Sequence, residues 1–360
     1  MKFNVAVSGL NATDNPAPGV AVIRSLREEP EREGKIIGLC YDAYEPGIFD
    51  PHSVDSVYLL PYPSKGKDAL MERMTAISKS EPIDLVFPNL DSELDNFVDA
   101  QQELNKLGIQ SFLPTRDQLK RRAKKNLPAL AKELELEVPE SKTVSDLREA
   151  ERAAEELTFP LMVKGLFYEA FHVSTVAELF SGTQWIAQRW GFPVLLQKYI
   201  PGEEYNLAGL GDGFGGLVSA VCMKKVFVTD KGKGWAGVSI LNEDLFKASE
   251  RFVSTLKWRG GFELETLISD EGRLYLIEVN PRFPAWIYLA KACGINLPYA
   301  YCQLALGKQP NVRRSYDAGV MFVHYTTDLV ANVSQLESLL TRRELHHGAN
   351  AREAVREIER

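Results

Sequence analysis

The chain has 360 residues, a formal net charge of −7, 45% hydrophobic residues and 25% charged residues. This length exceeds one ordinary core, so we expect two or three domains of a globular protein. The negative charge argues against a general nucleic-acid-binding protein, which needs a basic surface. No run of 18 apolar residues indicates a membrane span, and no signal peptide is recognised, so we expect a cytoplasmic protein without membrane or nucleic-acid partners.

The four cysteines do not indicate a metal site or a disulfide framework. Cys40, Cys222, Cys293 and Cys302 are scattered and form no CxxC pair. Small buried hydrophobic side chains in a reducing compartment are the expected role.

The first ~115 residues alternate strand and helix patterns. Apolar strands are expected within 2–10, 35–41, 54–61 and 83–88, and helices over 17–29, 68–80 and 91–108. Such alternation predicts βαβ units with a parallel sheet, whose ligands bind at the carboxyl ends of the strands.

The first turn of this region, "SGLNATDNPAPG", lacks the GxGxxG pattern of a dinucleotide-binding domain, so a dehydrogenase is discounted. Its Asn11, Asp14 and Asn15 either cradle a polar ligand or only form the turn.

The chain changes character after residue 115. A basic helix and an acidic helix are predicted over 115–141, and apolar strands follow within 158–175 and 192–210. The segments "GFELETLIS" and "RLYLIEVNPR" flank the turn "DEG", which indicates a β-hairpin. One strand within 318–327 and polar helices ending in "AREAVREIER" are expected in the last ~50 residues.

The hairpin carries the side chains that suggest chemistry. Glu278 and Asn280 lie two residues apart, so they share one face of a strand about 7 Å apart, and Glu265 on the other arm can reach that face. Carboxylate and amide oxygens are the ligands that Mg²⁺ prefers. Arg282, two residues further, can neutralise a phosphate or an oxyanion. A surface hairpin held by salt bridges is the alternative.

Two further segments supply groups for a nucleotide. Lys164 ends an apolar strand, where it either faces solvent or points at phosphate. In "LLQKYIPGEEYN", the backbone of Lys198 and Ile200 can offer a carbonyl and an N–H to adenine, and Glu204 can accept from ribose hydroxyls.

Together, Lys164, "QKYIPGEEYN", "GGFELE" and "EVNPR" resemble the ATP-grasp superfamily, especially the branch of carbamoyl-phosphate synthetase large subunits and carboxylate–amine ligases. The resemblance covers roughly residues 1–310 and implies a mixed α/β and α+β fold. It places a Rossmann-like pre-ATP-grasp domain in residues 1–115, the linker helices and lid in 116–203, the large subdomain with the metal site in 204–310, and a C-terminal extension in 311–360.

The resemblance also implies roles for individual residues. Lys164 and Arg282 would act on the reacting phosphoryl and acyl groups, and Glu265, Glu278 and Asn280 would hold one or two Mg²⁺ (or Mn²⁺) ions. ATP would contact a larger set, namely Lys124, Lys164, Gln197, Lys198, Tyr199, Ile200, Glu204 and Lys224. For the pre-lid lysine, the family's spacing selects Lys124, with Lys125 as the alternative, and Ala123 stands where an aspartate is usual.

Other segments differ from the family or leave two interpretations open. Gly165 stands alone where a glycine-rich phosphate loop is usual, and "FPAW" replaces the glycine run after "NPR", so Phe283 and Trp286 are expected to crowd the acceptor side. Asp91 and Glu93 are expected in the same pocket. The basic loop "DKGKGWAG" after Lys224 and Lys225 either closes over the triphosphate or is an ordinary hairpin loop.

The implied reaction is activation of a carboxylate by ATP as an acyl-phosphate, followed by attack of an amine from an amino acid or a peptide. The alternatives are a carbamoyl-phosphate synthetase-like enzyme that activates bicarbonate or carbamate, and a non-catalytic nucleotide-binding protein. The superfamily also suggests a homodimer.

Overall fold

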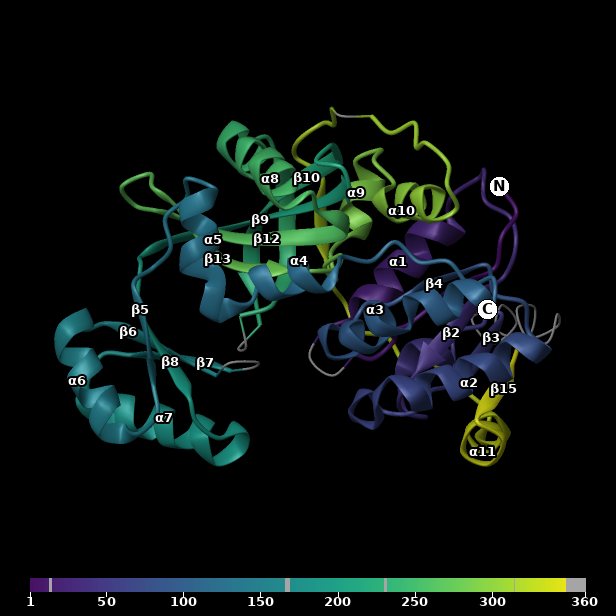
Figure 1. Ribbon diagram of the computed structural model, residues 1–360, viewed down its shortest axis with the longest axis horizontal. Helices are drawn as coiled ribbons and strands as arrows, with labels where there is room; N and C mark the ends of the chain where they lie inside the picture. The colour runs from purple at the N-terminus through teal and green to yellow at the C-terminus, as the bar shows by residue number, and fades with distance from the viewer. Residues whose placement is uncertain (13–14, 166–168, 230–231, 314, 348–360) are drawn as a thin grey trace.

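The computed structural model describes residues 1–12, 15–165, 169–229, 232–313 and 315–347, and its strands form three sheets (Figure 1). A five-stranded sheet contains the N-terminal residues, a four-stranded sheet lies in a separate lobe with two helices, and a six-stranded sheet lies between helices and the N-terminal region.

The N-terminal sheet has the order β15-β3-β2-β1-β4 and is parallel except for β15. All residues of β1, β2 and β4 are buried, as expected for a parallel sheet covered on both faces. The elements of this region are β1 (Val5–Val7), α1 (Pro18–Arg27), β2 (Ile36–Cys40), β3 (Ser56–Leu59), α2 (Gly66–Ser80), β4 (Leu85–Phe87) and α3 (Asp91–Lys106).

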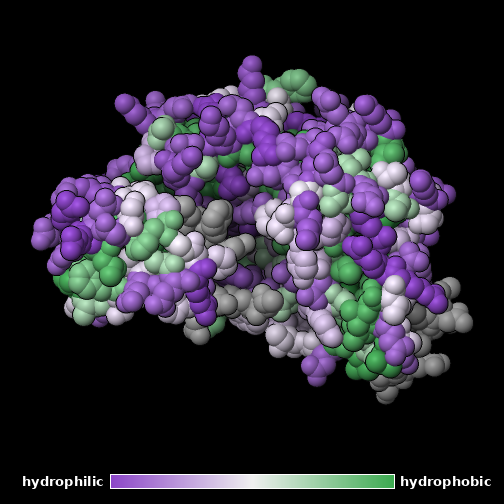
Figure 2. Space-filling model, turned by 60° about the horizontal axis from the view of Figure 1, so that its bottom comes forward, coloured by the Kyte–Doolittle hydropathy of each residue, from purple (hydrophilic) through white to green (hydrophobic). Residues whose placement is uncertain are grey.

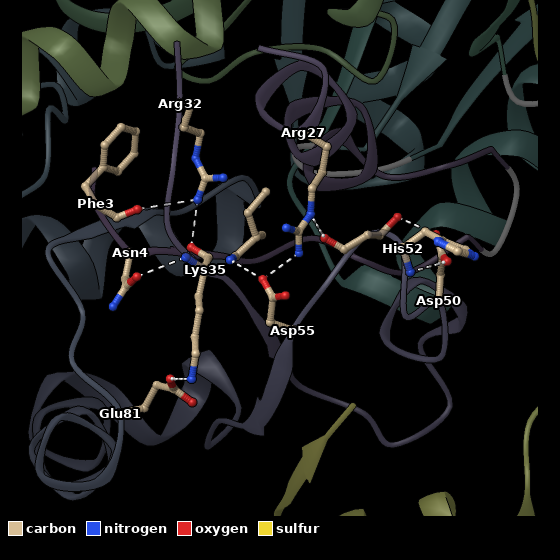
Figure 3. Close-up of polar contacts among 11 residues, drawn as sticks. Phe3, Asn4, Arg27, Arg32, Lys35, Asp50, His52, Asp55 and Glu81 are labelled. Carbon is tan, nitrogen blue, oxygen red and sulfur yellow. Dashed lines mark hydrogen bonds and ion pairs between the residues drawn. The ribbon is translucent and has the colours of Figure 1, made fainter. Parts of the chain in front are cut away.

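A network of hydrogen bonds and ion pairs connects the amino ends of β1, β2 and β3 (Figure 3). Asp55 accepts hydrogen bonds from the Arg27 guanidinium at 2.6 Å and from the Ile36 N–H at 2.7 Å. Arg32 donates to the carbonyl of Lys35 at 2.7 Å, and the Lys35 ammonium pairs with Glu81 at 2.7 Å. This network is at the end of the sheet opposite to the loops that bind ligands in parallel sheets.

The lobe of the four-stranded sheet follows two linker helices, α4 (Arg116–Arg121) and α5 (Leu127–Glu133). Its sheet is antiparallel with the order β5-β8-β6-β7. A core of apolar residues such as Leu161, Leu179 and Leu196 fills the space between this sheet and its two helices. The elements are β5 (Ser141–Val144), α6 (Leu147–Leu157), β6 (Leu161–Lys164), β7 (Ala170–Val173), α7 (Val176–Trp190) and β8 (Val194–Lys198).

The six-stranded sheet is antiparallel with the order β13-β12-β9-β10-β11-β14. Trp258 and Phe262 are buried in the core between this sheet and α8. The elements are β9 (Gly202–Asp212), β10 (Leu217–Val228), β11 (Gly234–Ile240), α8 (Glu243–Leu256), β12 (Arg259–Ser269), β13 (Leu274–Asn280), α9 (Tyr288–Ala292), α10 (Leu297–Ala305) and β14 (Met321–Val323).

The end of the described chain returns to the N-terminal sheet, which the sequence did not predict. After α11 (Val333–Arg342), the short strand β15 (Glu344–His346) pairs antiparallel with β3. The helix expected over 351–360 lies outside the described residues. Within the described part of the chain, no helix has the length and apolar character needed to cross a membrane.

Candidate active site

The hairpin of β12 and β13 brings the three predicted metal ligands to one face. Glu265 lies directly opposite Glu278 in the strand register, and Glu263 lies opposite Asn280. The amide nitrogen of Asn280 donates to Glu265 at 2.8 Å and to Glu263 at 2.9 Å. Because both bonds use the nitrogen, the amide oxygen of Asn280 stays available as a ligand.

Burial and mutual repulsion dominate the electrostatics of these carboxylates. Loss of solvation raises the pKa of Glu278; the charge of Lys124 opposes this rise, and the charge of Glu265 adds to it. Loss of solvation and then the charge of Glu265 likewise raise the pKa of Glu263. Two carboxylates held face to face are an arrangement that a cation between them would stabilise.

Two predicted lysines converge on the same carboxylates. The Lys124 ammonium lies 3.4 Å from Glu278, so the short 3-10 helix between α4 and α5 (Lys124–Asn126) contributes a cation to the hairpin. Lys164, at the end of β6, has a lowered pKa, first because it is desolvated and second because Lys124 is near; Glu278, Glu265 and Glu204 oppose that shift. The structure therefore groups Lys124 and Lys164 with the carboxylates of the hairpin. Lys125 makes no ion pair with these carboxylates.

Of the two adjacent lysines in β10, the structure brings Lys225 into this cluster and not the predicted Lys224. Lys224 pairs with Glu203 at 2.6 Å and lies over the ring of Tyr205. Lys225, whose side chain is 8% exposed, pairs with Glu204 and lies 3.8 Å from Glu265. Burial would lower the pKa of Lys225, but the carboxylates of Glu265 and Glu204 raise it. A register shift between Lys225 and Phe227 marks an irregularity at this point of β10.

Arg282 joins the hairpin to the N-terminal region. Its guanidinium lies 3.3 Å from Asp91, the first residue of α3, and donates to the carbonyl of Phe283. Burial would lower the pKa of Arg282, but Asp91, Glu263, Glu265 and Glu278 raise it. The guanidinium therefore remains charged beside the carboxylates.

The predicted adenine-binding segment connects β8 to β9. Gln197 is 6% exposed, whereas Lys198 is exposed and donates its N–H to the Glu140 carbonyl at 2.8 Å. Tyr199 donates its N–H to the Pro160 carbonyl. Among the described residues, the Ile200 N–H has no hydrogen-bond acceptor, as a backbone donor to a ligand requires.

Beside this segment, the ring of Tyr199 meets His172 edge-on at 4.6 Å. Figure 2 shows that the surface is hollowed between the lobe of the four-stranded sheet and the rest of the molecule.

Three residues expected in the acceptor pocket are buried instead. Phe283 and Trp286 are 0% and 5% exposed, so "FPAW" packs into the core and does not crowd a pocket. Glu93 is also buried, where it accepts hydrogen bonds from the Ser8 and Tyr41 hydroxyls and from the N–H groups of Asn89 and Leu90. Asp91 reaches the cluster through Arg282, and Trp286 reaches it from the core through its indole N–H. Asp14 lies outside the described residues.

Glu263 is a residue of the cluster that we did not predict. It is 4% exposed and accepts hydrogen bonds from Asn206 at 2.7 Å, Trp286 at 2.8 Å and Asn280. The sequence "ELE" could have indicated this residue, because side chains alternate along a strand and Glu263 must therefore share a face with Glu265.

Two surface cavities lie away from this cluster. One of about 430 Å³ is lined by residues of β7 and α7, including Phe171 and Trp185, and one of about 540 Å³ is lined by residues 215–217 and the end of α8. Neither cavity contains a carboxylate of the hairpin.

The donor chemistry of the hairpin fits Mg²⁺ or Mn²⁺. In the part of the chain that the structure describes, no group of three or more His, Cys, Asp or Glu side chains is arranged to hold a metal. The candidate set is instead two carboxylates and the amide oxygen of Asn280, which leaves coordination positions for phosphate oxygens, as Mg²⁺ sites in nucleotide-binding enzymes do.

Known proteins with similar sequences support the resemblance to the ATP-grasp superfamily independently of the site geometry. Residues 192–328 match the family described as "ATP-grasp in the biosynthetic pathway with Ter operon". The large chain of carbamoyl phosphate synthase from Thermoanaerobacter sp. (strain X514) is 25% identical over 193 residues, which are 50% of this chain and 18% of that relative. The chain thus spans only a small part of that curated relative.

Solved structures resemble the whole arrangement. The biotin carboxylase domain dimer of Hydrogenobacter thermophilus 2-oxoglutarate carboxylase, in complex with MgADP, ADP and bicarbonate, matches with a TM-score of 0.67 at 15% identity over 87% of this chain and 72% of that chain. L-amino acid ligase from Bacillus licheniformis matches with a TM-score of 0.63 at 18% identity over 84% and 74%. The predicted ATP-grasp fold class is confirmed by these structures, and the resemblance to the ATP-grasp superfamily is supported by the family match over residues 192–328 and by the carbamoyl phosphate synthase relative.

Proposed function

We propose that this protein is an ATP-dependent ligase that activates a carboxylate as an acyl-phosphate and joins it to an amine. The observation that carries the proposal is the convergence of Glu265, Glu278 and Asn280 with Lys124 and Lys164. A set of hard oxygen donors beside lysines suits a metal–triphosphate, because the cations neutralise phosphate charge that the carboxylates alone would repel.

The reaction would proceed in two balanced steps. A carboxylate oxygen takes the γ-phosphoryl group of ATP, and ADP leaves. The amine nitrogen then attacks the acyl carbon, inorganic phosphate leaves with the former C–O bond electrons, and the amine loses a proton. No residue of the chain forms a covalent bond, so catalysis rests on positioning and charge neutralisation.

We assign the following roles to the chain's own residues. Lys124 and Lys164 would hold the phosphates, and Arg282, oriented by Asp91, would neutralise the oxygen that gains charge in both steps. Glu265, Glu278 and Asn280 would hold Mg²⁺ or Mn²⁺, which would supply positive charge to neutralise the phosphoryl group during its transfer. The backbone of residues 198–200 would bind adenine. Glu204, which forms an ion pair with Lys225, would bind ribose.

The experiment is ADP release from Mg–ATP with panels of amino acids and short peptides as carboxylate and amine, with mass spectrometry of the product. A new amide with one ADP per bond supports the proposal. ATP binding without ADP release in any combination would favour a non-catalytic nucleotide-binding protein.

Bicarbonate is the second substrate to test in place of the carboxylate, because both the carbamoyl phosphate synthase sequences and the biotin carboxylase structures match this chain. Bicarbonate-dependent ADP release without any organic carboxylate would select this reaction over amide formation. The panel therefore includes bicarbonate with and without ammonia.

A further inference from the structure

We infer that Glu263 is a positioning residue that fixes which atom of Asn280 faces the cation, and that Trp286 and Asn206 lock Glu263 in place. The inference rests on the proposed metal site and adds a residue to it. Glu263 lies opposite Asn280 in the strand register, two residues before Glu265.

The hydrogen bonds of Glu263 occupy both of its oxygens. Oε1 accepts from Asn206 at 2.7 Å and from the Trp286 indole N–H at 2.8 Å, and Oε2 accepts from Asn280 at 2.9 Å. A carboxylate whose two oxygens are held by three N–H groups is not free to turn towards a cation. Glu263 is therefore distinguished from Glu265, which accepts one hydrogen bond from Asn280 and has Lys225 3.8 Å away, and from Glu278, which pairs with Lys124 at 3.4 Å.

The amide of Asn280 has two orientations, and Glu263 decides between them. An amide has donors on its nitrogen and acceptors on its oxygen. With carboxylates on one side, at Glu263 and Glu265, only the nitrogen can face that side, so the oxygen must face the other. The oxygen is the atom that a hard cation binds.

The lock on Glu263 explains the unusual sequence after "NPR". Trp286 is 5% exposed, and its indole N–H reaches back to Glu263 from the segment just beyond β13. Asn206 reaches Glu263 from β9, the strand on the other side of β12. Three strands and the following turn thus contribute to one orientation, which makes the position of Glu263 rigid.

The test measures Mn²⁺ affinity, not turnover, by the electron paramagnetic resonance signal of the free ion with saturating ADP. Glu263→Gln keeps the size of the side chain but places an amide nitrogen where Oε2 was. Asn280 must then turn its oxygen towards that nitrogen and its nitrogen towards the cation. We expect Mn²⁺ affinity to fall about 10- to 100-fold, the usual effect of losing a partner of a metal ligand, with the melting temperature close to that of the wild type.

A rescue variant separates positioning from a structural role. Asn280→Asp alone places a third carboxylate beside Glu263 and Glu265 and should weaken Mn²⁺ binding by repulsion. In the double variant Glu263→Gln/Asn280→Asp, one aspartate oxygen accepts from the new amide and the other stays at the cation. We expect the double variant to bind Mn²⁺ more tightly than either single variant.

Each outcome decides something. Equal Mn²⁺ affinity in the wild type and in Glu263→Gln overturns the inference. A double variant that binds Mn²⁺ no more tightly than Asn280→Asp also overturns it. This second comparison can be made even if Glu263→Gln alone does not fold. If instead the wild type binds no Mn²⁺ with ADP, the proposed metal site itself fails, and the role of Glu263 fails with it.

Discussion

The network of Figure 3 and the candidate active site differ in how their charges are arranged. In the network of Figure 3, opposite charges pair: Arg27 with Asp55, and Lys35 with Glu81. The candidate active site also contains ion pairs, such as Lys124 with Glu278, but it holds like charges close together as well: Glu265 faces Glu278, and Lys164 is near Lys124. The first arrangement stabilises a fold, whereas the second is destabilising unless a charged ligand enters, so the contrast separates a structural cluster from a functional one.

The largest effect should come from removing a carboxylate of the site. We expect Glu278→Gln to lower ADP formation by about 10²-fold or more, because one hard ligand and the partner of Lys124 are lost. The melting temperature should not fall, since this carboxylate is buried against another.

The matched control for this variant is Glu271→Gln, in the turn of the same hairpin, where the glutamate is exposed and pairs with Arg273. Control and wild type should be equal in both assays. Normal turnover in Glu278→Gln would remove the proposed mechanism.

The second prediction is that Lys164 supports activity but lowers stability. The pKa of Lys164 is lower in the folded protein than in the unfolded chain, so its protonated form destabilises the fold at neutral pH. This destabilisation decreases as the pH rises from the folded pKa to the unfolded pKa. Lys164→Met should therefore abolish ADP formation while keeping or raising the melting temperature at pH 7.

Calorimetry together with the ADP assay checks this prediction, and Lys142→Met is the control in the same sheet, because Lys142 pairs with Glu156. A melting temperature that falls more in Lys164→Met than in the control would show that Lys164 is structural.

The third prediction concerns the network of Figure 3, where a substitution should lower stability and leave activity unchanged. Asp55→Ala removes the acceptor of the Ile36 N–H and the ion-pair partner of Arg27, whose Nε still donates to the Ser53 carbonyl, so we expect a loss of about 2 kcal/mol in the free energy of unfolding. The kinetics of ADP release should stay the same, because the network lies at the amino ends of the strands. Urea unfolding and the ADP assay measure the two quantities, and a change in turnover without a change in stability would contradict the comparison.

The smallest effect is expected where the N-terminal region touches the site. Asp91→Asn removes the charge that holds the Arg282 guanidinium at 3.3 Å, and we expect kcat to fall about three- to tenfold with little change in the KM for ATP. Asp95→Asn is the control one turn later in α3, where the aspartate pairs with Arg116 on the surface. Equal kcat values in the two variants would leave Asp91 without a role in the reaction.

Local patterns predicted much of this molecule. The alternation of side chains along a strand suffices to place Glu278 and Asn280 on one face, and continuous apolar runs suffice to predict the parallel strands of the N-terminal sheet. These inferences need no knowledge of distant contacts.

The rest depended on register and on long-range packing. Whether Lys224 or Lys225 enters the cluster is decided by the pairing and irregularity of β10, and the role of Glu263 needs Asn206 from another strand. The strand β15 has three residues and pairs with a strand nearly 300 positions earlier, too short and too distant for a local signal. Burial of Phe283 and Trp286 is likewise a property of the packed core.

The most direct measurement is an anomalous difference map from crystals grown with Mn²⁺ and ADP. The account predicts a manganese peak among Glu265, Glu278 and Asn280, with the phosphates of ADP towards Lys124 and Lys164. Nucleotide bound elsewhere, or manganese bound with ADP but away from this hairpin, would contradict it.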